Sequence, residues 1–114
     1  MTHALETFFD AWADGNADAV EAAAMPDIHY QDPGTPDPLH GTKAVADYIS
    51  LFAQHVPGAT AKVAHMSEVG GAVRVTIAFR MPDGMEKHGQ YFADLSEDGR
   101  IARLIGFVGM GTPE

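Results

Sequence analysis

One carboxylate in this chain stands where the backbone is tightly restricted. Asp32 lies two residues after Tyr30 and directly before Pro33, in a stretch that contains three prolines and two glycines. Proline fixes its own φ and disfavours helical backbone at the preceding residue, so Asp32 is expected at a strand end with limited orientation. Such a carboxylate, with a neighbouring phenol, is suited to general acid or base chemistry. An aspartate that merely caps a turn also occurs in this setting, and both interpretations stay open.

The six histidines do not have the spacing of a metal site. No pair stands at the i, i+4 spacing of helical ligands or the i, i+2 spacing of strand ligands, so we expect no bound metal. His40 closes the proline-rich loop that begins after Asp32, and we expect it near the mouth of a pocket. The absence of cysteine excludes thiolate chemistry, and the chain has no Gly-x-Ser-x-Gly elbow and no glycine-rich phosphate loop. We therefore expect chemistry without a cofactor.

Apolar residues at helical spacing predict three helices that would position these groups. The first runs from Thr2 to near Gly15, and Asn16 is placed to cap a second, short helix that Pro26 stops. Thr42 is expected to cap a third helix, which Pro57-Gly58 ends. The inward side of the first helix carries Leu5, Phe8, Phe9 and Trp12. The inward side of the third helix carries Val45, Tyr48, Ile49, Phe52 and Val56.

The rest of the chain has the alternation of β-strands. Residues 28–32 form a short strand in which Ile28, Tyr30 and Asp32 share one face, and a loop over Pro33 to His40 follows. Beyond Thr60, glycine-containing turns separate four strands, which predicts an antiparallel meander. The last three of these strands are expected at Ala72 to Met81, Met85 to Ser96 and Arg100 to Gly109.

Helices followed by a meander predict an α+β fold, as one domain over residues 1–114. A strongly curved, mostly antiparallel sheet would wrap onto the long helix and enclose a pocket, with Asp32 and Tyr30 at or near its mouth or floor. The pocket is expected to be apolar. Its predicted ligand-binding residues are Phe8, Trp12, His40, Tyr48, Phe52, Val75, Ile77 and Phe79.

Charge and hydropathy restrict the partners. Sixteen acidic residues against seven basic ones give a net charge of −9, which repels phosphate backbones, so we expect no nucleic acid. No apolar run approaches the ~20 residues of a spanning helix, and the start has no signal peptide, so a soluble cytoplasmic protein without membrane contact is expected. The second face of the sheet is partly apolar, which favours a homodimer through the sheet. The ligand expected in the pocket is a small apolar molecule.

The order of these elements, with several short motifs, resembles the nuclear transport factor 2-like superfamily. The motifs are the Asp-Gly-Asn turn at residues 14–16, Tyr-Gln-Asp-Pro at residues 30–33, the Gly41-Thr42 helix start and the hairpin at residues 98–101. The superfamily includes SnoaL-like polyketide cyclases, ketosteroid isomerases and limonene-type epoxide hydrolases. The resemblance covers nearly the whole chain and implies a cone-shaped fold with three N-terminal helices around a pocket.

Within the superfamily, the local match is closest to ketosteroid isomerase, whose general-base aspartate also precedes a proline. The resemblance implies that Asp32 moves a proton between two carbons of a bound enone, with Tyr30 nearby. The isomerase also uses a tyrosine of its first helix and a protonated aspartate as donors to the enolate oxygen. The tyrosine position corresponds to Phe8, which cannot donate, and the aspartate position falls near Tyr91, whose phenol can.

Two further members of the superfamily remain as comparisons. The epoxide hydrolases hold their water with a Tyr-Gln-Asn segment where this chain has Tyr-Gln-Asp at residues 30–32. However, these enzymes also require an aspartate on the last strand, and this chain has Gly106 near that position. The second comparison is a ligand-binding or interaction module of the same fold that has no catalytic activity. We therefore expect an isomerase or cyclase of a small apolar carbonyl compound, with a non-catalytic module as the alternative and an epoxide hydrolase as the third.

Overall fold

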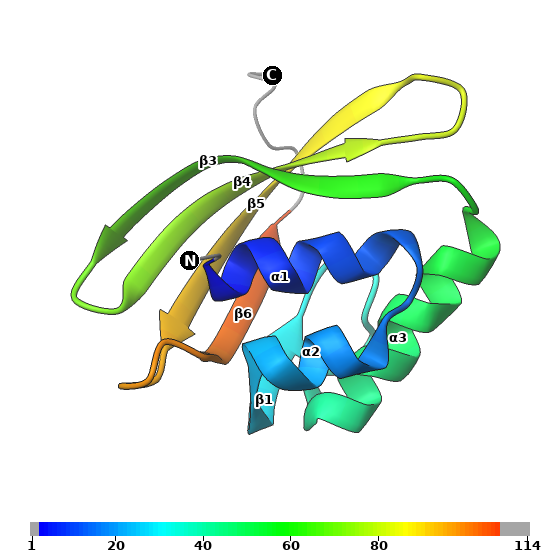
Figure 1. Cartoon of the computed structure of the whole chain (residues 1–114). Coiled ribbons are helices and arrows are strands. Elements are labelled where there is room, and N and C mark those ends of the chain that lie inside the picture. The colour runs from blue at the N-terminus through cyan, green and yellow to red at the C-terminus, as the bar shows by residue number, and fades with distance from the viewer. Residues whose placement is uncertain (1–2, 108–114) are drawn as a thin grey trace.

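The computed structural model describes residues 3–107 (Figure 1). Most of the helical structure precedes the longest strands, as the sequence predicts. The helices are α1 (Ala4–Asp10), the 3-10 turn η1 (Ala11–Ala13), α2 (Ala17–Ala23) and α3 (Thr42–His55). The strands are β1 (Ala24–Gln31), β2 (Leu39–His40), β3 (Thr60–Val69), β4 (Ala72–Arg80), β5 (Glu86–Leu95) and β6 (Ile101–Phe107). The predicted α+β class with three N-terminal helices is confirmed.

The six strands form one mixed sheet in the order β2-β1-β6-β5-β4-β3. Among the described strand pairs only β1–β6 is parallel, so the predicted mostly antiparallel sheet is confirmed. The last strand of the chain therefore lies beside the first long one. Because β1 ends at Gln31, Asp32 is the first residue to leave the sheet, as the proline after it predicts.

Several predicted boundaries differ in detail. The first helix is divided, since α1 continues as a 3-10 turn from Ala11, and α2 ends at Ala23 because the chain enters β1 before it reaches Pro26. Pro26 is tolerated in β1 because the pairing with β6 is interrupted there, between Ala24 and His29.

Helix α3 begins with a different cap from the predicted one. Gly41 is its N-cap, with a φ of 91°, and Thr42 is the first helical residue and makes no capping bond. By contrast, the Asn16 cap of α2 is confirmed, because its side-chain oxygen accepts a hydrogen bond from the Ala19 N–H at 3.2 Å. The predicted last strand extended to Gly109, and its end lies outside the described residues.

The helices lie against one face of the sheet (Figure 1), and the buried side chains between them form the core. Val73, Val75 and Ile77 alternate along β4 and are fully buried, and they form one core cluster with the aromatic residues of α1. The fully buried side chains include Leu5, Phe8, Phe9, Val45, Ile49, Val73, Val75 and Ile77. This packing fixes α3 and the end of β1 relative to each other, which determines the geometry described below.

The opposite face of the sheet carries two exposed aromatic residues. Phe92 on β5 and Phe107 on β6 are 45% and 55% exposed. Among residues 3–107, no helix is long and apolar enough to cross a membrane. The same residues contain no group of three or more histidine, aspartate or glutamate side chains that could hold a metal ion.

Candidate active site

The carboxylate of Asp32 is buried and accepts hydrogen bonds from three groups. Oδ2 accepts from the Tyr30 hydroxyl at 2.5 Å, and Oδ1 accepts from the Gly34 backbone N–H at 2.7 Å. The Tyr48 hydroxyl lies within hydrogen-bond distance of both oxygens, at 2.9 Å from Oδ1 and 3.0 Å from Oδ2. These donors hold the carboxylate in one orientation.

The loop after β1 holds the backbone of Asp32 as well as its side chain. The Thr35 N–H donates to the Asp32 carbonyl at 3.1 Å, and the Thr35 hydroxyl lies 3.1 Å from the Asp32 nitrogen and 3.0 Å from its carbonyl oxygen. The sequence interpretation of a turn-capping aspartate is therefore correct for its local bonds. It does not exclude the functional interpretation, because the same carboxylate also borders a pocket.

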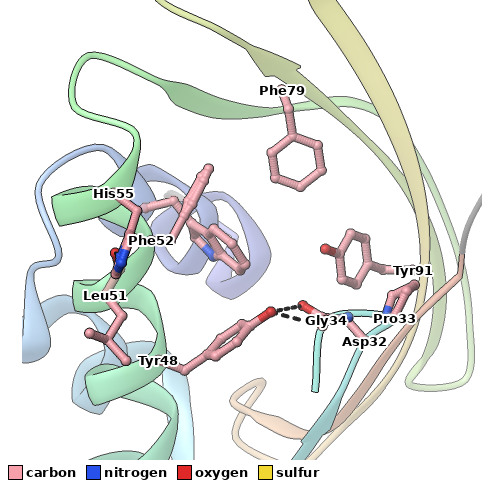
Figure 2. Close-up of a pocket in the computed structure, with 10 residues that line it drawn as sticks. Asp32, Pro33, Gly34, Tyr48, Leu51, Phe52, His55, Phe79 and Tyr91 are labelled. Carbon is pink, nitrogen blue, oxygen red and sulfur yellow. Dashed lines mark hydrogen bonds between the residues drawn. The ribbon is translucent and has the colours of Figure 1, made fainter. Parts of the chain in front are cut away.

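Asp32 lies in the wall of an open pocket of about 440 Å³ (Figure 2). The volume is in the usual range for small-molecule sites. Of the residues between 3 and 107, five aromatic ones line it, and Asp32 is the one carboxylate. The lining residues are Trp12, Asp32, Pro33, Gly34, Tyr48, Leu51, Phe52, His55, Phe79 and Tyr91. The pocket is therefore formed by η1, the loop after β1, α3, β4 and β5.

Two donors to Asp32 differ in their access to this pocket. Tyr30 is fully buried behind the carboxylate and does not line the pocket, so its hydroxyl serves to position Asp32. Tyr48 is half-buried, lines the pocket and shares its hydroxyl between two oxygens. Tyr48 is thus the donor that a bound molecule could displace from Asp32.

Tyr91 presents its hydroxyl to the pocket from the sheet side (Figure 2). Two glycines make room for its ring. A Cβ on Gly106, the cross-strand partner of Tyr91, would come within 2.5 Å of the ring, and a Cβ on Gly89 would come within 3.3 Å. The ring also packs edge-on against Phe9, with centroids 4.9 Å apart. Position and orientation of this phenol are therefore set by the sheet.

All three tyrosines of the chain belong to this cluster, and all three have raised pKa values. Burial is the main cause for each. The negative charge of Asp32 raises the pKa of Tyr48 and Tyr91 further, and the pKa of Tyr30 is also raised by Tyr91 and Asp32. At neutral pH the three phenols are consequently neutral and can donate hydrogen bonds.

The structure brings together most of the predicted site residues. Asp32 and Tyr91 line the pocket with four of the predicted ligand-binding residues, which are Trp12, Tyr48, Phe52 and Phe79. The indole Nε1 of Trp12 has no hydrogen-bond partner within residues 3–107. The lining residues that sequence reasoning missed are Pro33, Gly34, Leu51 and His55.

Four predicted ligand-binding residues lie elsewhere. Phe8, Val75 and Ile77 are fully buried in the core and do not reach the pocket. His40 is exposed on β2, where it pairs with His29 and their ring centroids are 5.0 Å apart. Because side chains alternate along β1, His29 faces away from Tyr30 and Asp32, and His40 shares its side of the sheet.

The chain is similar to one known domain family and to several solved structures. A family model described as a SnoaL-like domain matches residues 5–104. A candidate isomerase of the SnoaL-like family from Agrobacterium tumefaciens is 24% identical, with a TM-score of 0.79, over 91% of this chain and 92% of that one. A candidate polyketide cyclase from Sinorhizobium meliloti is 20% identical, with a TM-score of 0.75, over 93% and 94%.

A third solved structure has a different chemistry. An epoxide hydrolase of the LEH-like type from M. tuberculosis is 22% identical, with a TM-score of 0.67, over 91% of this chain and 78% of that one. At these identities the likeness shows a shared fold, nuclear transport factor 2-like, and not a shared activity. No protein of curated function matches the sequence.

Proposed function

The chain belongs to the SnoaL-like domain family, and on that premise we propose that it binds a small apolar carbonyl compound and moves a proton on it. The observation that carries the proposal is the buried Asp32 carboxylate in the wall of an aromatic pocket. An isomerase or a cyclase of this kind needs a base that is fixed in position and shielded from water on most sides.

In the proposed reaction, Asp32 takes a proton from the carbon next to the ligand's carbonyl. The C–H bond breaks, its electron pair forms the enolate, and negative charge develops on the carbonyl oxygen. In an isomerase the proton then returns to another carbon. In a cyclase the enolate carbon bonds to the carbon of a second carbonyl group, whose π electrons move to its oxygen, and that oxygen takes the proton from Asp32. Both outcomes balance without a cofactor, because the proton and the electron pair stay with the ligand and Asp32.

Tyr91 is the proposed donor to the developing enolate oxygen. Its hydroxyl points into the pocket and its raised pKa keeps it protonated, so it can stabilise negative charge there. Tyr48 would release one carboxylate oxygen when the ligand enters. Phe8, at the position of the isomerase tyrosine, is buried in the core outside the pocket, so a donor from the first helix is not part of this proposal.

A ligand-binding module without catalysis is the second candidate, and one observation favours it. The oxygens of Asp32 already accept hydrogen bonds from three protein groups, as those of a purely structural carboxylate would. Epoxide hydrolysis is not proposed. Its required aspartate would fall near Gly106, where the ring of Tyr91 occupies the space that a side chain would need.

The experiment is a screen of cyclic enones and polyketide-like carbonyl compounds for isomerisation or ring closure. We expect turnover by the wild type and a loss of about 10² or more for Asp32→Asn. Asp37→Asn is the matched control, because Asp37 is exposed in the same loop and does not line the pocket. A compound turned over equally by wild type and Asp32→Asn would exclude Asp32 as the base. Binding of such compounds without any turnover would instead support the non-catalytic binding module.

A further inference from the structure

The charge of Asp32 has no cationic partner within the described residues. None of the ion pairs among residues 3–107 includes Asp32, and the pocket lining contains no lysine or arginine. The donors to the carboxylate are two neutral phenols and a backbone N–H. They satisfy its oxygens but leave its net charge uncompensated. A buried charge of this kind strongly favours a group of opposite sign nearby.

The walls of the pocket are of the type that binds organic cations. The ring of Trp12 meets those of Phe52, Phe79 and Tyr48 at 71°, 66° and 88°, with centroids 5.0 Å, 5.8 Å and 6.2 Å apart. Rings at such angles form the corners of a box and do not stack on one another. Figure 2 shows Phe52, Phe79, Tyr48 and Tyr91 around one common space with Asp32 at its edge.

These two features complement each other for one class of ligand. The face of an aromatic ring carries partial negative charge and attracts an ammonium group, most strongly where water is excluded. The carboxylate adds a full negative charge at one side of the same box. The net charge of −9 also favours the approach of cations and disfavours that of anions.

We propose that this pocket binds a small organic ammonium ion, a protonated amine or a quaternary ammonium group, between the aromatic rings and the carboxylate of Asp32. The positive centre faces Asp32, and its alkyl or aryl substituents contact Phe52, Phe79 and Trp12. This binding goes beyond the proton transfer proposed above and does not depend on it, because it requires only the charge of Asp32 and the rings.

The test compares two ligands of nearly the same shape, benzyltrimethylammonium and the neutral neopentylbenzene. The chain has a single tryptophan, Trp12, and it lines the pocket, so its fluorescence reports binding directly. We expect the wild type to bind the cation at least about tenfold more tightly than the neutral compound. Equal affinity for the two ligands, or no binding of the cation, overturns the proposal.

Two variants separate the contributions of charge and ring. Asp32→Asn removes the charge, and we expect the preference for the cation to fall to the severalfold part that the rings contribute, while the neutral compound binds as before. Phe52→Leu keeps an apolar side chain but removes one ring face. It should lower the affinity for the cation severalfold more than the affinity for the neutral compound. Unchanged preference in a folded Phe52→Leu protein would contradict the role of the ring. Neither result depends on turnover, so failure here is distinct from failure of the proton-transfer proposal.

Discussion

The bonds from two tyrosines to Asp32 should differ in their contribution to stability. Tyr30 is fully buried and donates to one oxygen at 2.5 Å, whereas Tyr48 is half-buried and shares its hydroxyl between both oxygens. Replacing each by phenylalanine removes one hydroxyl and changes little else. The two variants therefore compare the loss of one hydroxyl at a fully buried position, Tyr30, with the same loss at Tyr48, which borders the pocket.

The expected magnitudes follow from this difference. A hydrogen bond to a charged group contributes about 1.5–3 kcal/mol, and a buried acceptor that loses its donor is not rehydrated. Tyr30→Phe should therefore lower the free energy of unfolding by about 2–3 kcal/mol. At Tyr48 the pocket can admit a water molecule in place of the hydroxyl, so Tyr48→Phe should cost about 1 kcal/mol or less.

Urea denaturation at pH 7 measures both costs, and the slope m should stay unchanged for each variant. A double-mutant cycle with Asp32→Asn provides the control. When the carboxylate is replaced by a neutral amide, the cost of Tyr30→Phe should fall to about 1 kcal/mol. A cost at Tyr48 equal to or greater than the cost at Tyr30 would refute the view that the buried phenol holds the carboxylate.

Three further predictions concern the surroundings of this network. Gly106→Ala should cost about 1–3 kcal/mol, because its Cβ would meet the ring of Tyr91 at 2.5 Å; an unchanged urea midpoint would contradict this packing. The pKa values of all three tyrosines are raised in the folded state, so stability is complete below pH ~10 and decreases at higher pH, where the unfolded tyrosines ionise. Tyrosinate absorbance should therefore appear only well above pH 10, and a midpoint near pH 10 in a protein that circular dichroism shows to be folded would contradict the burial of the cluster. We also expect the sheet face with Phe92 and Phe107 to pair with a second copy, so that light scattering gives a dimer for the wild type and a monomer for Phe92→Lys; a monomeric wild type would remove this expectation.

Local patterns in the sequence were sufficient to predict the fold class and the place of Asp32. Alternation after Pro26 put Tyr30 and Asp32 on the same face, and the proline after Asp32 marked the end of the strand. The glycine-containing turns separated the last four strands. These features depend on short stretches of sequence and not on contacts with distant parts of the chain.

The contacts between distant segments could not be predicted in this way. The bond from Tyr48 to Asp32 joins residues 16 positions apart on different elements, and it depends on how α3 packs against β1. The sequence predicts His40 near the pocket mouth, but the two-residue strand β2 has no pattern of its own, and its pairing with β1 sets His40 beside His29 and away from the pocket. In the sequence Gly106 is only a position without an aspartate, whereas in the structure it admits the ring of Tyr91.

Proton exchange into deuterated water tests whether Asp32 is a base. A cyclic ketone or enone that quenches or shifts the Trp12 fluorescence would be incubated with the protein, and exchange at the carbon next to its carbonyl followed by proton NMR. This measurement needs only the removal of a proton and no final product. Wild type and Asp37→Asn should exchange well above the buffer rate, with Asp32→Asn lower by about 10² or more. Equal exchange by wild type and Asp32→Asn on a ligand bound in the pocket would contradict the assignment of Asp32 as the base.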